Sequence, residues 1–305
     1  MATQHIFTLS DVYRQSLEGT WVLQGWNAGW FGGGTALSTV DRISFVSDTS
    51  TAVAKGPLSA GRQQHAATGN LTDGWFGAGN APAVTSTVDR IIFSADTATA
   101  VTKGSLSFAR ADVMATGNLT DGWFSGGFPA KSTIDRIIFS ADTATAVAKG
   151  PLSAARYSAG GTGNATDGWF GGGGDSGAKS IVDRIIFSAD TATAVAKGPL
   201  SLARFYPGAT GNATDGWFGG GSPAPAAVST VDRIIFASDT ATAVAKGPLS
   251  SGRVGSGATG NSTDAWFGGS AAPLSNIDRV IFASDTATAV AKGPLSVARG
   301  YLGAV

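Results

Sequence analysis

The sequence contains no cysteine and, among its 305 residues, only two histidines (His5 and His65) and one glutamate (Glu18). Without cysteine there are no disulfides and no thiolate metal sites. Hydrolytic and acid-base enzymes need paired carboxylates, or a nucleophile beside a base. Two histidines without repeated partners supply neither arrangement. We therefore predict a protein that is not an enzyme and that carries no metal and no cofactor.

Charge is also scarce. Charged residues make up 14% of the chain, against about a quarter in an average protein. Lys+Arg and Asp+Glu both number 21, so no net positive field recruits nucleic acid. No apolar run approaches the ~20 residues that span a bilayer, and Met1–Ser10 lacks the pattern of a secretory signal. We expect no nucleic-acid partner, no membrane insertion and a soluble cytoplasmic protein, unless the chain belongs to a larger particle.

Glycine is abundant, at 44 residues, and it occurs within a unit that is repeated six times. Each unit contains a Trp-Phe pair and, further on, an Asp-Arg pair. Successive Asp-Arg pairs are 46 to 49 residues apart. The tryptophans are Trp30, Trp75, Trp123, Trp169, Trp217 and Trp266. The twelve Asp-Arg residues are Asp41, Arg42, Asp89, Arg90, Asp135, Arg136, Asp183, Arg184, Asp232, Arg233, Asp278 and Arg279.

Each unit reads as four short strands. In the fifth unit these strands are Gly208–Asn212, Asp215–Gly220, an S-T-V-D-R-I-I-F stretch and a T-A-T-A-V-A-K stretch that ends at Gly-Pro. β-branched residues favour strands, and Pro ends the last one because it cannot donate to a ladder. Four strands every ~47 residues are typical of propeller blades. We predict an all-β fold, a six-bladed β-propeller of four-stranded antiparallel blades over residues 21–305, with Gly-Gly turns in every blade.

The unit resembles the kelch repeat in its Gly-Gly pair after a hydrophobic strand (Phe218-Gly219-Gly220), its following aromatic (Phe236) and its Pro-to-Arg stretch (Pro248–Arg253). Kelch repeats usually carry Trp in the fourth strand, whereas this chain has Ala-Val there and Trp beside the Gly-Gly pair. The near-identical units with F-G-G-G and A-T-G-N also resemble repeat proteins of marine bacteriophages, especially cyanophage tail and virion components. These resemblances imply a kelch-like propeller located in the virion, at the phage tail.

Features present in all six units are interpreted as architecture. We assign the twelve Asp-Arg residues to in-blade or interblade hydrogen-bonded clamps. The turn between the third and fourth strands is expected to be set by Asp96, which can bond to its own backbone two residues on. The tryptophans are interpreted as blade core, the alternative being ligand-stacking platforms. The glycine-rich stretch Gly172–Gly177 is not followed by a helix that could hold a phosphate, and the N-x-T sequons follow from turn chemistry and duplication.

Variation among the units is confined to two segments, one after the Gly-Gly strand and one after the terminal Arg. In a four-stranded antiparallel blade these two connections emerge at the same end, so the variation maps to one face of the disc. Loops on a rigid scaffold commonly carry recognition, and the alternative is neutral drift. His65 is expected at the surface. The candidate binding residues of this face are Gln64, His65, Phe128, Tyr157, Phe205, Tyr206 and Tyr301.

Residues 1–20 lie outside the repeat and could form an arm with a short helix over Asp11–Leu17, capped by Ser10. The arm could dock onto other virion proteins or copies of the same chain, or pack on its own disc. The first functional hypothesis is a virion binding protein that recognises a host-surface glycan or protein. The alternative is a free carbohydrate-binding, lectin-like propeller.

The last expectation concerns ring closure. The tail Leu302–Val305 matches the start of an inner strand in other units and repeats its Gly-Ala. We predict that this tail supplies the inner strand of blade 1 beside Trp30–Gly33, which displaces Trp21–Trp26 to support the arm.

Overall fold

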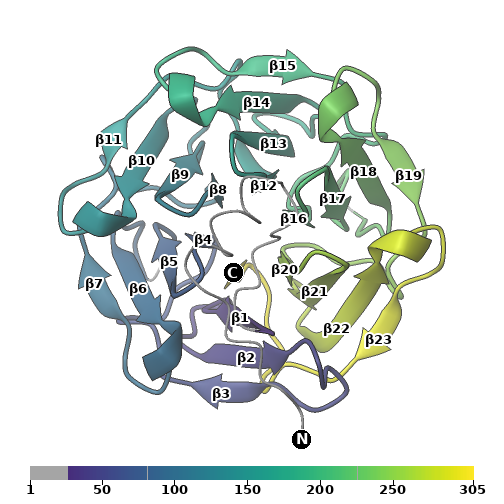
Figure 1. Ribbon diagram of the computed structural model, residues 1–305, viewed down its shortest axis with the longest axis horizontal. Helices are drawn as coiled ribbons and strands as arrows, with labels where there is room; N and C mark the ends of the chain where they lie inside the picture. The colour runs from purple at the N-terminus through teal and green to yellow at the C-terminus, as the bar shows by residue number, and fades with distance from the viewer. Residues whose placement is uncertain (1–26, 81, 225) are drawn as a thin grey trace, which may run out of the picture.

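The computed structural model describes residues 27–80, 82–224 and 226–305, and these residues form six four-stranded antiparallel sheets arranged around a central axis (Figure 1). The six-bladed β-propeller is therefore confirmed. The proposed arm, its helix at 11–17 and the segment Trp21–Trp26 lie outside the described residues.

In every blade the strands run in order from the axis to the rim. Blade 1 contains β24 (Gly303–Ala304), β1 (Ala28–Gly32), β2 (Val40–Ser44) and β3 (Val53–Lys55). Blade 2 contains β4 (Ala66–Gly69), β5 (Asp73–Gly77), β6 (Val88–Ile92) and β7 (Val101–Lys103). Blade 3 contains β8 (Met114–Gly117), β9 (Asp121–Ser125), β10 (Ile134–Ile138) and β11 (Val147–Ala148). Blade 4 contains β12 (Tyr157–Gly163), β13 (Asp167–Gly174), β14 (Val182–Ile186) and β15 (Val195–Lys197). Blade 5 contains β16 (Gly208–Gly211), β17 (Asp215–Gly219), β18 (Val231–Ile235) and β19 (Val244–Lys246). Blade 6 contains β20 (Gly257–Gly260), β21 (Asp264–Ser270), β22 (Leu274–Ile281) and β23 (Val290–Lys292).

The ring is closed by the C-terminal tail. β24 pairs antiparallel with β1, with Gly303 opposite Gly32 and Ala304 opposite Phe31. Trp30 and Val305 exchange both backbone hydrogen bonds, at 2.8 and 3.0 Å. The predicted closure by Leu302–Val305 is confirmed, and the C-terminus lies near the axis in Figure 1. Because first and last sequence segments share one sheet, blade 1 holds the two ends of the propeller together.

The second strand ends in a left-handed turn, since positive φ angles are accessible to glycine at little cost. Gly220 and Gly221 illustrate this turn, with φ of 70° and 99°. The expectation of a Gly-Gly turn in every blade is wrong for blade 2, where Ala78 takes a φ of 64°, and for blade 6, where Ser270 follows Gly269. The Ala78 methyl group is fully buried in the core between blades 2 and 3. Its packing offsets the backbone cost of the left-handed conformation.

The third-to-fourth turn differs from the expected Asx turn. In blades 2 to 6 it begins with one turn of 3-10 helix: η1 (Phe93–Ala95), η2 (Phe139–Ala141), η3 (Phe187–Ala189), η4 (Phe236–Ser238) and η5 (Phe282–Ser284). The Asp96 carboxylate that follows η1 bonds to another blade instead. It accepts the Trp30 indole N–H at 2.9 Å and pairs with Lys55 at 3.2 Å. The turn aspartate is thus an interblade contact, not a local turn former.

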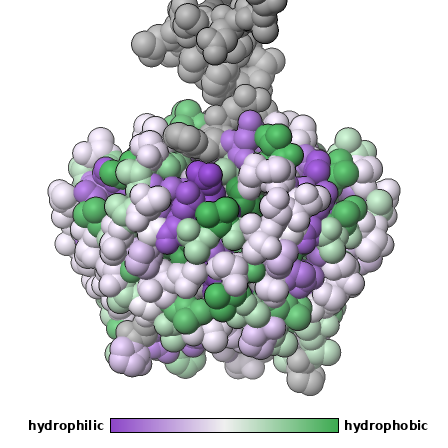
Figure 2. Space-filling model, turned by 90° about the horizontal axis from the view of Figure 1, so that it is seen from below, coloured by the Kyte–Doolittle hydropathy of each residue, from purple (hydrophilic) through white to green (hydrophobic). Residues whose placement is uncertain are grey.

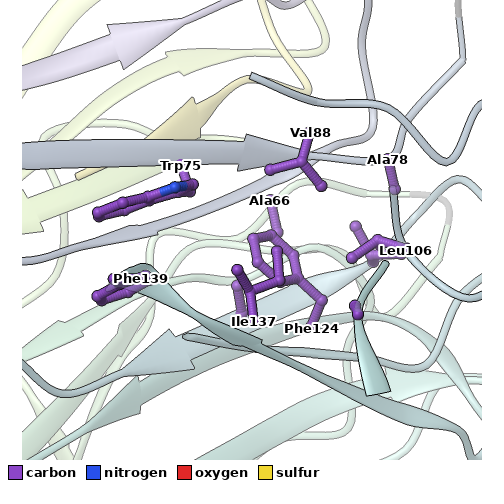
Figure 3. Packing of buried hydrophobic residues seen from close by; sticks show 11 residues of the cluster. Ala66, Trp75, Ala78, Val88, Leu106, Phe124, Ile137 and Phe139 are labelled. Atoms are coloured by element: carbon purple, nitrogen blue, oxygen red, sulfur yellow. The ribbon is translucent and has the colours of Figure 1, made fainter. Parts of the chain in front are cut away.

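The hydrophobic core consists of six layers, each lying between two adjacent blades. Every repeat tryptophan is 1% exposed and stacks on the phenylalanine that opens the 3-10 turn, or its equivalent Phe45, of the next blade. Trp75 and Phe139 have ring centroids 3.8 Å apart and nearly parallel planes. Figure 3 shows them in the layer between blades 2 and 3, with Val88 above Phe124 and Ile137. The tryptophans are blade core, as predicted, so they offer no exposed stacking platform.

The repeated Asp-Arg residues are confirmed as interblade clamps, but the two members of a pair do not bond each other. Neighbouring strand residues point to opposite faces of a sheet. In blade 5, Asp232 pairs at 2.8 Å with Arg204, which lies in the crossover from blade 4. Arg233 pairs at 3.3 Å with Asp285 of blade 6. Each blade is therefore ion-paired in both directions around the ring.

The rim of the disc alternates small hydrophobic patches with polar residues in the edge-on view of Figure 2. One valine of each outer strand is half exposed, at 51 to 57%: Val53, Val101, Val147, Val195, Val244 and Val290. Within the part of the chain that the structure describes, no helix has the length and apolar character needed to cross a membrane.

Candidate functional site

The two variable segments of each blade lie on the same face of the disc and bond to each other. Gln63 pairs with Asn80, Ala111 with Phe128, and Phe205 with Ser222. In each case the first residue precedes an inner strand and the second follows the Gly-rich turn. The predicted convergence of both variable segments on one face is confirmed, and we call this surface the variable face.

At the centre of the variable face, six residues form a ring, one from each blade. All six have left-handed φ angles of 55 to 67°. Each backbone N–H donates to the carbonyl of the ring residue in the preceding blade, with N–O distances of 2.6 to 3.2 Å. We call these residues the mouth ring: Gln64, Asp112, Ser158, Tyr206, Gly255 and Tyr301. The ring fixes the backbone conformation, whereas the side chain at this position changes between blades, with only tyrosine occurring twice.

Below the mouth ring, the inner strands enclose the central channel. A cavity of about 100 Å³ is lined there by the mouth ring and the first residues of β4, β8, β12, β16, β20 and β24. Small residues such as Ala67, Ala115 and Gly161 form its wall. A Cβ added at Gly255 would lie 2.6 Å from Cδ1 of Tyr301, so glycine at this ring position makes room for the tyrosine ring. The cavity opens on the variable face.

Five aromatic side chains that the sequence singled out form a continuous chain of contacts across this face. Ring centroids lie 5.3 Å apart for Phe128 and Tyr157, and 5.7 Å for Tyr157 and Phe205. Phe205 then contacts Tyr206 at 6.4 Å, and Tyr206 contacts Tyr301 at 5.0 Å. We call these five residues the aromatic ridge. It begins at the 53%-exposed Phe128 of blade 3 and ends in the mouth ring.

His65 does not lie at the surface as expected, because it is 5% exposed. Its Nε2 accepts the backbone N–H of Gly303 at 3.2 Å, which ties the closing strand to blade 2. Burial, together with the charge of the nearby Arg62, lowers the pKa of His65 to about 3. A neutral imidazole that accepts through Nε2 is a structural residue of ring closure. We therefore remove it from the candidate binding residues.

Three residues of the mouth ring were missed by the sequence reasoning, namely Gly255 and the polar residues Asp112 and Ser158. Asp112 is 7% exposed and Ser158 is 3% exposed. Neither Oδ1 of Asp112 nor Oγ of Ser158 makes a well-formed hydrogen bond within the described structure. Burial raises the pKa of Asp112 to about 6, although the side chains of Tyr206, Ser158 and Gln64 lie close enough to oppose the rise. The signal that could have found all three residues is their alignment with Gln64 and Tyr206 in the repeat.

A second, larger hollow of about 270 Å³ lies on the opposite face, between blades 2 and 3. Asn70, Asp73, Arg90 and Leu119 are among its lining residues. Its charged groups already serve the fold, since Arg90 pairs with Asp73 at 3.1 Å and with Asp142 at 3.1 Å. Among residues 27–80, 82–224 and 226–305, no three His, Cys, Asp or Glu side chains form a group suited to a metal ion.

In comparisons with known proteins, no protein-family model matches the chain and no curated protein matches it. The kelch and bacteriophage resemblances therefore gain no support from the comparisons. What stands from the resemblance is the architecture, six blades of four antiparallel strands.

Proposed function

We propose that this protein is a non-enzymatic recognition module whose variable face binds a carbohydrate on a host surface. The observation that carries the proposal is the aromatic ridge. Five rings from four blades meet on the one face where the repeat varies, and they run from an exposed phenylalanine into a polar cavity. Aromatic rings stack on flat apolar ligand faces, and a few polar groups then fix orientation.

The chemistry of the rest of the molecule supports binding over catalysis. The repeated Asp and Arg side chains are consumed by interblade ion pairs, and His65 is held neutral beneath the surface. The groups that remain at the mouth of the channel are a carboxylate, hydroxyls and an amide, which are suited to hydrogen bonding. In this proposal the protein is a virion component at a phage tail, and residues 1–20 attach it to other virion proteins or to copies of itself.

The alternative is a free lectin with one site at each blade junction. The hollow beside Asn70 and Arg90 favours it, because it lies between two blades and beside a repeat tryptophan. That tryptophan, Trp75, is 1% exposed and stacked on Phe139. Its ring faces are therefore not free for a sugar, and we prefer the variable face.

A glycan array separates the two sites. The wild-type protein is compared with Phe128→Ala plus Phe205→Ala on the ridge, and with Leu119→Ala on the opposite face. We expect the ridge variant to lose at least tenfold in binding and the Leu119 variant to bind like the wild type. Loss of binding in the Leu119 variant alone would support the blade-junction lectin. An array without signal from the wild-type protein would contradict carbohydrate recognition at either site.

A further inference from the structure

Asp112 differs from every other buried aspartate of the described residues. Each of the others lies within 4 Å of an arginine or a lysine; for example Asp135 pairs with Arg110 at 3.1 Å and Asp183 with Arg156 at 2.7 Å. No such cation lies within 4 Å of Asp112 among the described side chains. A buried carboxylate is costly unless it is paired and hydrogen-bonded. All the other buried aspartates in the described part of the chain are paired with a cation, so the unpaired Asp112 carboxylate indicates that a cationic ligand binds here.

The groups around Asp112 supply no positive charge. Gln64 of blade 2, Ser158 of blade 4 and Tyr206 of blade 5 approach it, and its charge adds to the burial that raises the pKa of Tyr301. His65, on the next inner strand, stays neutral. The buried guanidinium groups of this region are committed elsewhere, because Arg110 is bonded to Asp135, Arg62 to Asp89 and Arg299 to Asp41. The channel mouth therefore holds one uncompensated negative charge at neutral pH.

The polar atoms that lack a hydrogen bond around Asp112 are oxygens able to accept one, and aromatic faces lie beside them. Oδ1 of Asp112, Oγ of Ser158 and Oγ of Ser256 are buried without a well-formed hydrogen bond, and all three residues line the channel cavity. The Tyr206 and Tyr301 rings meet edge to face at the same place. A protonated primary amine has three N–H donors, bonds strongly to a carboxylate and is attracted to aromatic faces. Its ammonium group can donate to Asp112 and Ser158 together, and its charge is attracted to the two tyrosine rings.

We propose that the channel mouth binds an amino sugar, whose ammonium group donates to Asp112 and Ser158 while its ring lies against Tyr206 and Tyr301. An alkyl amine would leave Ser256 and the amide of Gln64 unpartnered, whereas the hydroxyls of a sugar can bond to both. The cavity of about 100 Å³ takes the ammonium-bearing end, and the rest of a longer glycan follows the aromatic ridge. The inference rests on the proposed function, since it names the sugar that the variable face selects.

The test is calorimetric titration at pH 7 with four probes: D-glucosamine, N-acetylglucosamine, glucose and n-butylammonium. The proteins are the wild type, Asp112→Asn, and Asp175→Asn as a matched control. Asp175 is also an aspartate of the variable face, but its side chain is 40% exposed and paired with Lys179. Thermal unfolding of both variants verifies that they fold.

We expect glucosamine to bind the wild type and the Asp175 variant, and at least tenfold more weakly to the Asp112 variant. N-acetylglucosamine and glucose, which lack the charge, should bind at least tenfold more weakly than glucosamine. Equal affinity for glucosamine and N-acetylglucosamine, or an unchanged affinity in Asp112→Asn, would overturn the proposal. Equal affinity for butylammonium and glucosamine would overturn the assignment to a sugar. The protein could fail to bind glucosamine while its binding to the glycan array still depends on Phe128 and Phe205. That outcome would refute this inference alone and leave the proposed function in place.

Discussion

The buried clamp between Arg204 and Asp232 gives the most quantitative prediction about the fold. Both side chains are 0% exposed. The guanidinium also donates to the Phe218 carbonyl at 3.0 Å, and the carboxylate accepts from the Ser201 hydroxyl at 2.5 Å. Arg204→Met keeps the aliphatic volume but leaves the Asp232 charge buried without a cation. Breaking one partner of such a pair costs about 3–5 kcal/mol of unfolding free energy.

Two controls isolate the buried charge as the cause. Lys179→Met breaks the exposed pair with Asp175, which should cost at most about 0.5 kcal/mol. The double variant Arg204→Met with Asp232→Asn removes the stranded charge while keeping an acceptor for Ser201, and should recover about 2 kcal/mol of the loss. Urea unfolding followed by tryptophan fluorescence measures all three. Equal, small losses for Arg204→Met and Lys179→Met, or no recovery in the double variant, would refute the reasoning.

Three further predictions follow from ring closure and from the two unusual titrating groups. Deletion of residues 301–305 removes the inner strand of blade 1 and the buried Leu302, so the melting temperature should fall and light scattering should reveal association through the opened edge; an unchanged, monodisperse protein would contradict closure by this strand. His65 has a folded pKa of about 3 against an ordinary value of 6.5, so the unfolded state gains a proton first as pH falls. The wild type should therefore lose about 1.4 kcal/mol per pH unit below pH 6.5 relative to His65→Gln, and parallel stability curves would argue against a buried neutral imidazole. Asp112 has a folded pKa of about 6 against 3.8, so its cost appears as pH rises from 4 to 6 and persists above. Asp112→Asn should be up to about 3 kcal/mol more stable than the wild type at pH 8 and equal to it near pH 4; a less stable variant at pH 8 would show that the carboxylate is already satisfied.

The repeat made the architecture predictable, because six copies reveal both the period and the positions that never change. Blade number, strand order, the buried tryptophans and closure by Leu302–Val305 all follow from comparing units within one chain. The partners of the clamps were not predictable in the same way. Asp232 and Arg233 are adjacent in sequence, yet strand geometry sends them to different blades. Their partners, 28 and 52 residues away, are set by how blades pack.

The errors at the candidate site have a common physical origin. Segments between blades resemble surface loops in sequence, but in a propeller they run from the rim to the central axis and continue into the inner strands. His65 occupies a position at which four of the five other units have Val113, Ala159, Pro207 and Leu302 and the fifth has Ser256, and these mostly apolar residues indicate burial. Asp112 went unnoticed because the mouth ring exists only when six distant turns close on one another.

The most direct test of the central claim asks whether binding takes place on the variable face. Because the sequence has no cysteine, one introduced cysteine can be labelled without background. Ser176→Cys places a label in the exposed β13–β14 connection beside the ridge, and Leu119→Cys places it on the opposite face. Each variant is coupled to a bulky maleimide and its binding to the strongest array glycan is measured. The account predicts that the label at position 176 abolishes binding while the label at position 119 leaves it unchanged, and the reverse result would contradict it.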